Sequence, residues 1–168
     1  MNIIQAKDND FIDILFVVKQ CLKEKQGLFI GNKLYTDSEL SEKIKKDIED
    51  QALFLCQEHE SCIALIALGR QQPEEYRHIS WNDNSAHFLS IQNLIVHPHW
   101  QQKNIAEKLL LFAESFSTEQ GYSSLRFSTS NLSEQTVKIF EEAKFIRTGH
   151  LPATKQNMPC DCYEKILK

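Results

Sequence analysis

The chain lacks the features that mark several specialised protein classes. No apolar run in its 168 residues approaches the length of a membrane-spanning helix, and residues 1–10 contain no basic cluster followed by an apolar run. We therefore expect a soluble, cytoplasmic protein with no membrane partner. No internal repeat, low-complexity tract or linker divides the chain, and 42% of its residues are apolar. We predict one domain with a real hydrophobic core over residues 1–168.

Excess positive charge and metal-site spacings are also missing. The formal charge is −4, whereas a nucleic-acid-binding surface needs a basic field, so we expect no nucleic-acid partner. The five cysteines are an odd set without a secretion signal, which suits a reducing compartment. Neither the pair Cys160 and Cys162 nor the pair His97 and His99 has the spacing of a usual zinc site, so we expect no metal.

What the sequence does contain is an alternation of strand-like and helix-like apolar patterns. The first kind predicts strands over residues 2–6, 53–57, 62–68, 86–96, 124–129, 145–150 and 163–167. The second predicts helices over residues 11–25, from 37 or 38 to 49, from 105 to about 120 and from 133 to about 143. We expect Asp10 and Ser133 to cap two of these helices, and the polar segment 71–84 to be a long loop.

The most informative segment runs from Gln92 to Leu109. It reads as an apolar strand, a proline turn, a polar basic loop and an amphipathic helix. Such a junction directs backbone N–H groups and the positive end of a helix dipole to one spot, where a diphosphate can bind. Taken alone, the segment is better interpreted as an ordinary strand–loop–helix crossover.

The loop in this segment resembles the acyl-CoA-binding motif of the GNAT N-acetyltransferases, which usually reads Val-x-Pro-x-x-Gln/Arg-x-x-Gly-x-Gly/Ala. Val96, Pro98, Gln101 and Ala106 match, whereas Asn104 stands where glycine is usual. Asparagine tolerates a positive φ better than most non-glycine residues, so the turn remains available. Its side chain would then either fill the space of a phosphate or donate to one.

Further segments match later motifs of one bacterial branch of that family, in the expected order. They are residues 73–76 with 79–81, 120–126, 140–145 and 162–167. The resemblance covers essentially the whole chain. It implies a single-domain α/β (α+β) fold with a central mixed sheet of about seven strands and about four flanking helices.

The resemblance also implies where acetyl-CoA binds. Backbone groups of Leu94, Ile95 and Val96 would pair with its pantetheine arm. The loop amides would hold its diphosphate, and they belong to Gln101, Gln102, Lys103, Asn104, Ile105 and Ala106. Ser133 falls where an asparagine often contacts coenzyme A, although a capping role is as good an interpretation. Phe140 stands where the family often has a tyrosine, the proposed acid for the departing thiolate.

No side chain stands out as the general base. The positions where the family commonly has Glu or His hold Ser90 and Gln92, which could only hold a water that relays the proton. His87 is the tentative titratable candidate, and the acids at positions 74 and 75 are weaker ones. On the acceptor side, we expect Tyr76 and Trp81 to form walls of the pocket.

Two functions remain compatible with these patterns. The favoured one is an N-acetyltransferase that moves the acetyl group of acetyl-CoA directly onto a primary amine of a small molecule or peptide. An amine of low pKa suits a site without a carboxylate base. The alternative is a catalytically weak or inactive acyl-CoA-binding sensor or interaction protein. The sequence leaves the acceptor unidentified and leaves monomer and homodimer open.

Overall fold

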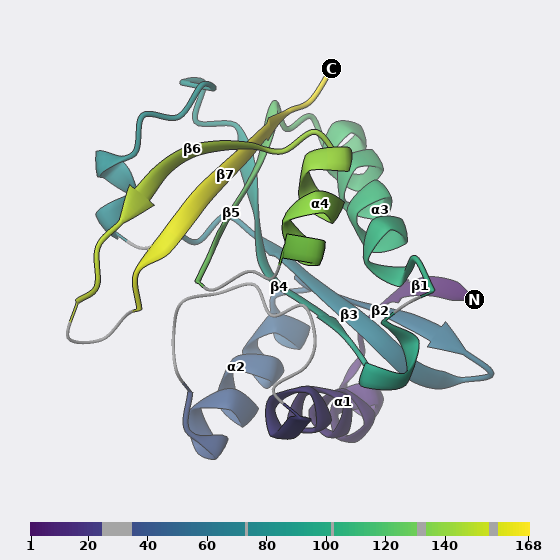
Figure 1. Cartoon of the computed structure of the whole chain (residues 1–168). Helices are drawn as coiled ribbons and strands as arrows, with labels where there is room; N and C mark the ends of the chain where they lie inside the picture. The colour runs from purple at the N-terminus through teal and green to yellow at the C-terminus, as the bar shows by residue number, and fades with distance from the viewer. Residues whose placement is uncertain (25–34, 73, 102, 131–133, 155–157) are drawn as a thin grey trace. The chain divides into compact units, whose positions relative to one another are not determined.

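The computed structural model describes residues 1–24, 35–72, 74–101, 103–130, 134–154 and 158–168. Within these residues, seven strands form one mixed sheet in the order β1-β2-β3-β4-β5-β7-β6, and four α-helices accompany it (Figure 1). The strands are β1 Asn2–Gln5, β2 Leu53–Glu58, β3 Ser61–Gly69, β4 Phe88–Val96, β5 Ser124–Thr129, β6 Ile146–Leu151 and β7 Cys160–Ile166. The helices are α1 Phe11–Glu24, α2 Asp37–Glu49, α3 Ile105–Glu119 and α4 Glu134–Glu142. The predicted fold class and element order are confirmed.

The described residues fall into two compact units. Unit 1 contains the described residues up to Ala67 together with Asn93–Leu109. Unit 2 contains Leu68–Gln92 and Leu110–Lys168. Strand β4 and helix α3 therefore each contribute residues to both units. The expectation of one domain over residues 1–168 stays a prediction.

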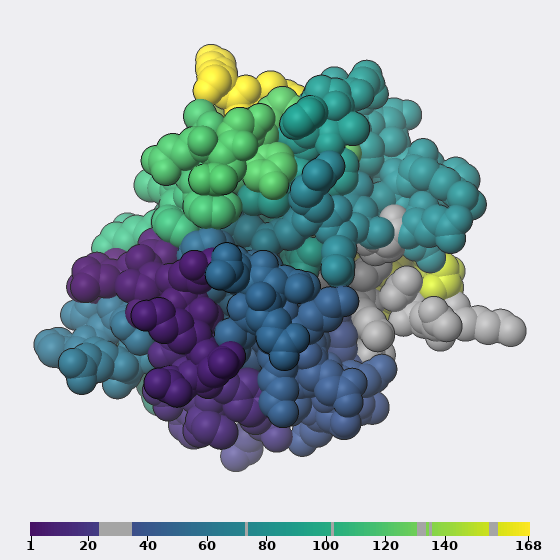
Figure 2. Space-filling model, turned by 180° about the vertical axis from the view of Figure 1, so that it is seen from behind, coloured from purple at the N-terminus to yellow at the C-terminus, as the bar shows by residue number. Residues whose placement is uncertain are grey.

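Unit 1 is built on the antiparallel strands β1, β2 and β3. Helices α1 and α2 bury one apolar face each in a shared core that includes Ile14, Ile44 and Leu55, because their apolar residues recur at helical spacing. Figure 2 shows the outer surface of these two helices in purple and blue. The strand Asn93–Val96 adds Ile95 to the same core.

The β2–β3 hairpin forms without a glycine in its turn. His59 and Glu60 both have positive φ angles, 48° and 64°, in the region that glycine or asparagine usually occupies. The predicted hairpin is confirmed. The paired β2 and β3 strands, which are buried along most of their length, hold the turn in this conformation.

One predicted helix cap is corrected by the structure. Asp10 does not cap α1, because Asp8–Asp10 form a short 3₁₀ helix before it and the Asp10 carboxylate accepts a hydrogen bond from Lys7 N. Helix α2 begins at Asp37, as predicted, and is capped by Thr36, whose hydroxyl accepts a bond from Glu39 N at 3.3 Å. The end of the first predicted helix, at residue 25, and the cap Ser133 lie outside the described residues.

Unit 2 contains the parallel pairing between β4 and β5, with Phe88, Leu89 and Ser90 level with residues 124–126. Strand β7 pairs antiparallel with β5 on one side and with β6 on the other. The face of β5 that carries Phe127 packs on aromatic rings of α4 and β7. The Phe127 ring lies 4.2 Å from Phe140 and 4.9 Å from Tyr163, measured between centroids.

Two strand boundaries and one loop in unit 2 also differ from the prediction. Strand β4 begins at Phe88 rather than at residue 86, because Ala86 has a φ of 60° that ends extended pairing. The predicted loop over residues 71–84 contains a 3₁₀ helix, η2, at Glu74–His78. Strand β7 begins at Cys160, three residues early, where it pairs with Leu151 of β6.

Among the residues with described positions, none belongs to a helix long and apolar enough to cross a membrane.

Candidate active site

The end of β4 is held by hydrogen bonds from three directions within unit 1. The Val96 carbonyl accepts from Cys21 Sγ at 3.2 Å and from Gln101 Nε2 at 3.4 Å. The backbone N–H of His97 donates to Ile63 O at 2.9 Å. These bonds fix the point at which the chain leaves the sheet and enters the proline turn.

The turn itself is a single 3₁₀ turn, Pro98–Trp100, that starts with proline. The His99 N–H donates to His97 Nδ1 at 3.3 Å, and the two imidazole rings are stacked with centroids 5.2 Å apart. Lys103 Nζ lies 4.0 Å from the centroid of the Trp100 ring. A cation is therefore held over an aromatic face just before α3.

Asn104 adopts the left-handed conformation, with a φ of 53°, immediately before α3 begins at Ile105. The first backbone bond of the helix runs from Lys108 N to Asn104 O at 3.3 Å. The N–H groups of Ile105, Ala106 and residue 107 lie before this bond, in the turn where an α-helix has no internal partner for them. The asparagine thus makes the turn that a glycine usually makes.

Not all of the predicted loop amides remain available to a ligand. The N–H of Gln101 donates to Pro98 O at 3.4 Å, and that of Lys103 donates to Trp100 O at 3.3 Å. Gln102 lies outside the described residues. This narrows the predicted diphosphate contacts to the amides of residues 104–106, with the Lys103 side chain beside them.

The tentative base His87 is not on a strand. It precedes β4, is exposed, and its carbonyl accepts bonds from the N–H and the hydroxyl of Ser123 at 2.7 and 2.9 Å. Its own N–H donates to Ser85 Oγ at 3.2 Å. The prediction that His87 shares the strand of Ser90 and Gln92 is wrong, because the positive φ of Ala86 delays the start of that strand.

Ser90 and Gln92 both lie on β4. The Ser90 hydroxyl is buried and accepts a bond from Gln72 Nε2 at 3.2 Å. Gln92 passes close to Gly69, where an added Cβ would lie 2.5 Å from Gln92 Nε2. Because residue 69 is glycine, the Gln92 amide has room beside it. Ser90 and Gln92 thus each place a polar group on β4.

Tyr76 and Trp81, which we expected to form walls of the acceptor pocket, lie together in a packed cluster. Their rings are 5.9 Å apart, and Trp81 Nε1 donates to the Tyr76 carbonyl at 3.2 Å. Tyr76 is only 6% exposed, and it packs with Cys160 and Cys162. Burial raises the pKa of the Tyr76 phenol well above its usual range, so this group stays neutral.

Phe140 is fully buried against Phe127, so its ring packs in the core of unit 2. On the same side of β5, two residues after Phe127, the Thr129 hydroxyl is buried and has no hydrogen-bond partner among the described residues. A buried hydroxyl without a partner costs free energy, and it provides a donor that a ligand can satisfy.

The sequence matches the family model for the acetyltransferase (GNAT) domain over residues 23–159. The chain belongs to the GNAT acetyltransferase family. It is therefore an acetyl-transferring enzyme, of a family whose members use acetyl-CoA as co-substrate together with an acceptor. No group of three or more His, Cys, Asp or Glu side chains that could hold a metal ion occurs in the described part of this GNAT protein.

Solved acetyltransferase structures share the fold of this GNAT protein. A Staphylococcus aureus Mu50 protein named as an acetyltransferase has a TM-score of 0.77 at 20% identity, covering 100% of both chains. An N-acetyltransferase from the same strain has a TM-score of 0.71 at 20% identity, covering 99% of this chain and 98% of that one. The ribosomal-protein-alanine N-acetyltransferase from Brucella melitensis has a TM-score of 0.73 at 16% identity, covering 99% of this chain and 100% of that one. Among curated proteins, none matches the chain.

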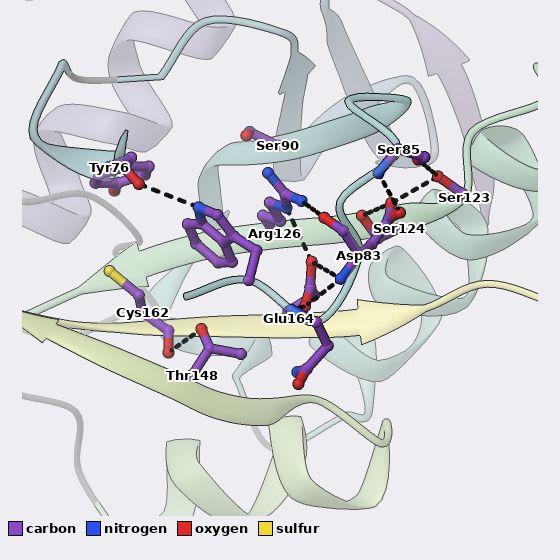
Figure 3. Close-up of polar contacts among 12 residues, drawn as sticks. Tyr76, Asp83, Ser85, Ser90, Ser123, Ser124, Arg126, Thr148, Cys162 and Glu164 are labelled. Carbon is purple, nitrogen blue, oxygen red and sulfur yellow. Dashed lines mark hydrogen bonds and ion pairs between the residues drawn. The ribbon is translucent and has the colours of Figure 1, made fainter. Parts of the chain in front are cut away.

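Sequence reasoning missed a buried ion pair in unit 2 of the GNAT protein. Arg126 of β5 donates to Glu164 of β7 at 3.0 Å, and their side chains are 5% and 0% exposed (Figure 3). The guanidinium lies between the rings of Trp81 and Phe88, with its central carbon 4.5 and 4.3 Å from their centroids. The sequence signal was a charged residue within each strand, Arg126 between Leu125 and Phe127 and Glu164 between Tyr163 and Lys165.

The same pair fixes the loop that leads into β4. Glu164 Oε2 accepts the N–H of Asn82 at 2.6 Å, and Arg126 donates to the carbonyl of Asp83. The Asp83 carboxylate in turn accepts the hydroxyls of Ser123 and Ser124 at 2.6 and 2.8 Å (Figure 3). These bonds outweigh partial burial and hold the pKa of the Asp83 carboxyl well below its usual range.

Proposed function

We propose that this protein is an N-acetyltransferase that moves the acetyl group of acetyl-CoA onto a primary amine of a small molecule or peptide. The observation that carries the proposal is the left-handed Asn104 directly before α3. It makes the turn into α3, where the first N–H groups have no partner within the helix, while the chain keeps the family motif on either side. The family match over residues 23–159 supports the acetyl donor.

The residues around this turn suit a diphosphate. The amides of residues 104–106 provide donors, and the N-terminus of the 15-residue helix α3 adds a partial positive charge. Lys103, held over Trp100, provides a full positive charge. By family resemblance, the backbone of Leu94–Val96 pairs with the pantetheine arm as an added strand. Bound acetyl-CoA supplies the reactive thioester.

In the proposed reaction, the amine nitrogen attacks the thioester carbonyl carbon. The C–N bond forms, the C–S bond breaks, the amine loses one proton and the thiolate gains one. Ser90 and Gln92 carry no basic side chain, so these positions do not supply a strong base. An acceptor that is already partly deprotonated near neutral pH fits such a site best.

Calorimetry and a thiol-release assay test this function. We expect acetyl-CoA to bind with one-to-one stoichiometry, and an amine to release free thiol in step with acetylated product. At pH 7 a peptide α-amine contains about 10²- to 10³-fold more free base than a lysine side chain, since their ordinary pKa values are roughly 7.7–8.0 and 10.4. We therefore expect α-amines to react at least about tenfold faster than lysine ε-amines.

Raising the pH provides the control for this preference. Above about pH 9.5 α-amines are fully deprotonated and lysine is partly so, and the rate difference should shrink. Equal rates for both amines at pH 7 would contradict the preference for a low-pKa acceptor. Absence of acetyl-CoA binding at millimolar concentration would contradict the proposed function as a whole.

Phe140→Tyr should raise the turnover number about tenfold, which is less than the roughly 10²–10⁴-fold typical of a positioned acid. The reason is that, by family resemblance, the ring of residue 140 lies near the departing sulfur. The gain is limited because a thiol with a pKa of roughly 8.5 already leaves well without help. Phe112→Tyr, which adds the same hydroxyl to a half-buried ring on α3, is the matched control. Unchanged turnover in Phe140→Tyr would mean that departure of the thiolate is not limiting.

A further inference from the structure

Unit 2 contains a cavity of about 300 Å³ beside the 3₁₀ helix η2 and the end of β6. Its apolar wall consists of Ile79, Leu151 and Pro152, and its polar lining includes Glu75 and His78. The volume is at the small end of ligand pockets, which span roughly 300–1,000 Å³. The cavity therefore suits a compact ligand that has one apolar and one polar end.

The charges around the cavity leave one carboxylate without a partner. Glu74 is exposed and pairs with Arg77 at 2.7 Å. Arg77 also donates to His78 Nε2 at 3.3 Å, so this imidazole already accepts a hydrogen bond. Glu75, which lines the cavity and is half-buried, has no hydrogen bond or ion pair among the described residues.

His150, the other ionisable residue that lines the cavity, is also paired. His150 Nδ1 lies 2.8 Å from Asp161 Oδ1, and Arg147 donates to the same oxygen at 2.7 Å. Arg147 and His150 hold the pKa of the Asp161 carboxyl below its usual value although partial burial opposes this. The unpaired charge at the cavity is thus the negative charge of Glu75, which favours a cation.

We propose that this cavity binds the acceptor, and that the acceptor is a small primary amine of low pKa with a compact, branched apolar body. Glu75 binds the protonated amine, and Ile79, Leu151 and Pro152 contact the apolar body. The amine attacks the thioester after it has lost its proton to water. This inference rests on the proposed acetyl transfer, and it adds a chemical class for the acceptor. Neutral and anionic molecules of the same shape gain nothing from Glu75 and are rejected.

Three probes with the same branched body test the proposal, namely leucinamide, whose α-amine has a low pKa, 2-hydroxy-4-methylpentanamide and 2-carbamoyl-4-methylpentanoate. Binding to the whole protein is measured by calorimetry with acetyl-CoA absent, and acetyl transfer to the amine by mass spectrometry. We expect the amine to bind at least about tenfold more tightly than the alcohol or the acid, because a charge-assisted contact discriminates by about this factor.

Glu75→Gln should weaken amine binding about tenfold and raise the KM for the amine to a similar extent. Glu74→Gln is the matched control, since Glu74 pairs with Arg77 rather than lining the cavity, and it should leave amine binding unchanged. Thr154→Trp changes an exposed lining residue into one large enough to fill the cavity, and it should abolish amine binding.

Each other outcome counts against a defined part of the proposal. Equal binding of the amine and the alcohol, or equal effects of the two glutamine substitutions, would overturn the role of Glu75. Amine binding that persists in Thr154→Trp would place the amine elsewhere. An amine that binds the cavity but is never acetylated, while acetyl-CoA binds normally, would overturn the acceptor assignment. Failure of acetyl-CoA itself to bind would instead overturn the proposed function.

Discussion

Asn104→Asp should weaken acetyl-CoA binding about 100-fold. Aspartate has the shape of asparagine and a similar tolerance of the left-handed φ of 53° at this position. It would place a full negative charge where we propose that the diphosphate binds. Calorimetric titration of acetyl-CoA into wild type and variant measures the change directly.

Folding provides the internal control for this substitution. A carboxylate before α3 interacts favourably with the helix dipole, typically by about 0.3–1 kcal/mol, so the variant should unfold no more easily than wild type. Unchanged acetyl-CoA affinity in a folded Asn104→Asp protein would show that the diphosphate does not lie at this turn. That result would remove the main support for the proposed binding mode.

Asn104→Gly separates the backbone from the side chain at the same position. Glycine adopts a positive φ without strain and removes the side-chain atoms that compete with phosphate in the complex, so acetyl-CoA should bind several-fold more tightly, as about 1 kcal/mol of relieved crowding would give. The same titration measures this gain. Weaker binding would show that the asparagine amide itself donates to a phosphate oxygen.

Local sequence patterns predicted the order of helices and strands because each of these elements is formed by residues that are close together in the sequence. The helical stripe of α3 and the apolar run of β4 are examples, and both were found close to their predicted bounds. The hairpin at His59 and Glu60 formed although neither residue favours a left-handed turn. There the burial of the two flanking strands decides the conformation of the turn. The conformational preferences of the turn residues do not include this burial, so they could not predict it.

The site could be predicted only where its parts are adjacent in sequence. The turn from Val96 to Asn104 is continuous in sequence, so motif spacing could indicate it as the candidate diphosphate site. Arg126 and Glu164, in contrast, are 38 residues apart and meet because β7 lies beside β5, an arrangement that skips β6. Strand order comes from packing of the whole sheet, and no local pattern in either strand specifies it.

Arg126→Met should lower the free energy of unfolding by about 3–5 kcal/mol, as is typical when one partner of a buried ion pair is removed. Methionine fills part of the space between Trp81 and Phe88, so the main cost is the buried Glu164 carboxylate left with only backbone donors near residues 82 and 83. Urea denaturation of wild type and variant measures the loss. Arg77→Met is the matched control, because its ion pair is 65% and 80% exposed and should contribute at most about 1 kcal/mol.

Glu164→Gln in the Arg126→Met background separates the charge from the packing. The amide keeps an acceptor for the Asn82 N–H but carries no charge, so the double variant should be more stable than Arg126→Met alone. If the double variant is less stable than Arg126→Met, the carboxylate is not the source of the cost. The stacking of Arg126 on Trp81 and Phe88 would then account for the stability of this part of unit 2, because that contact is lost in both variants.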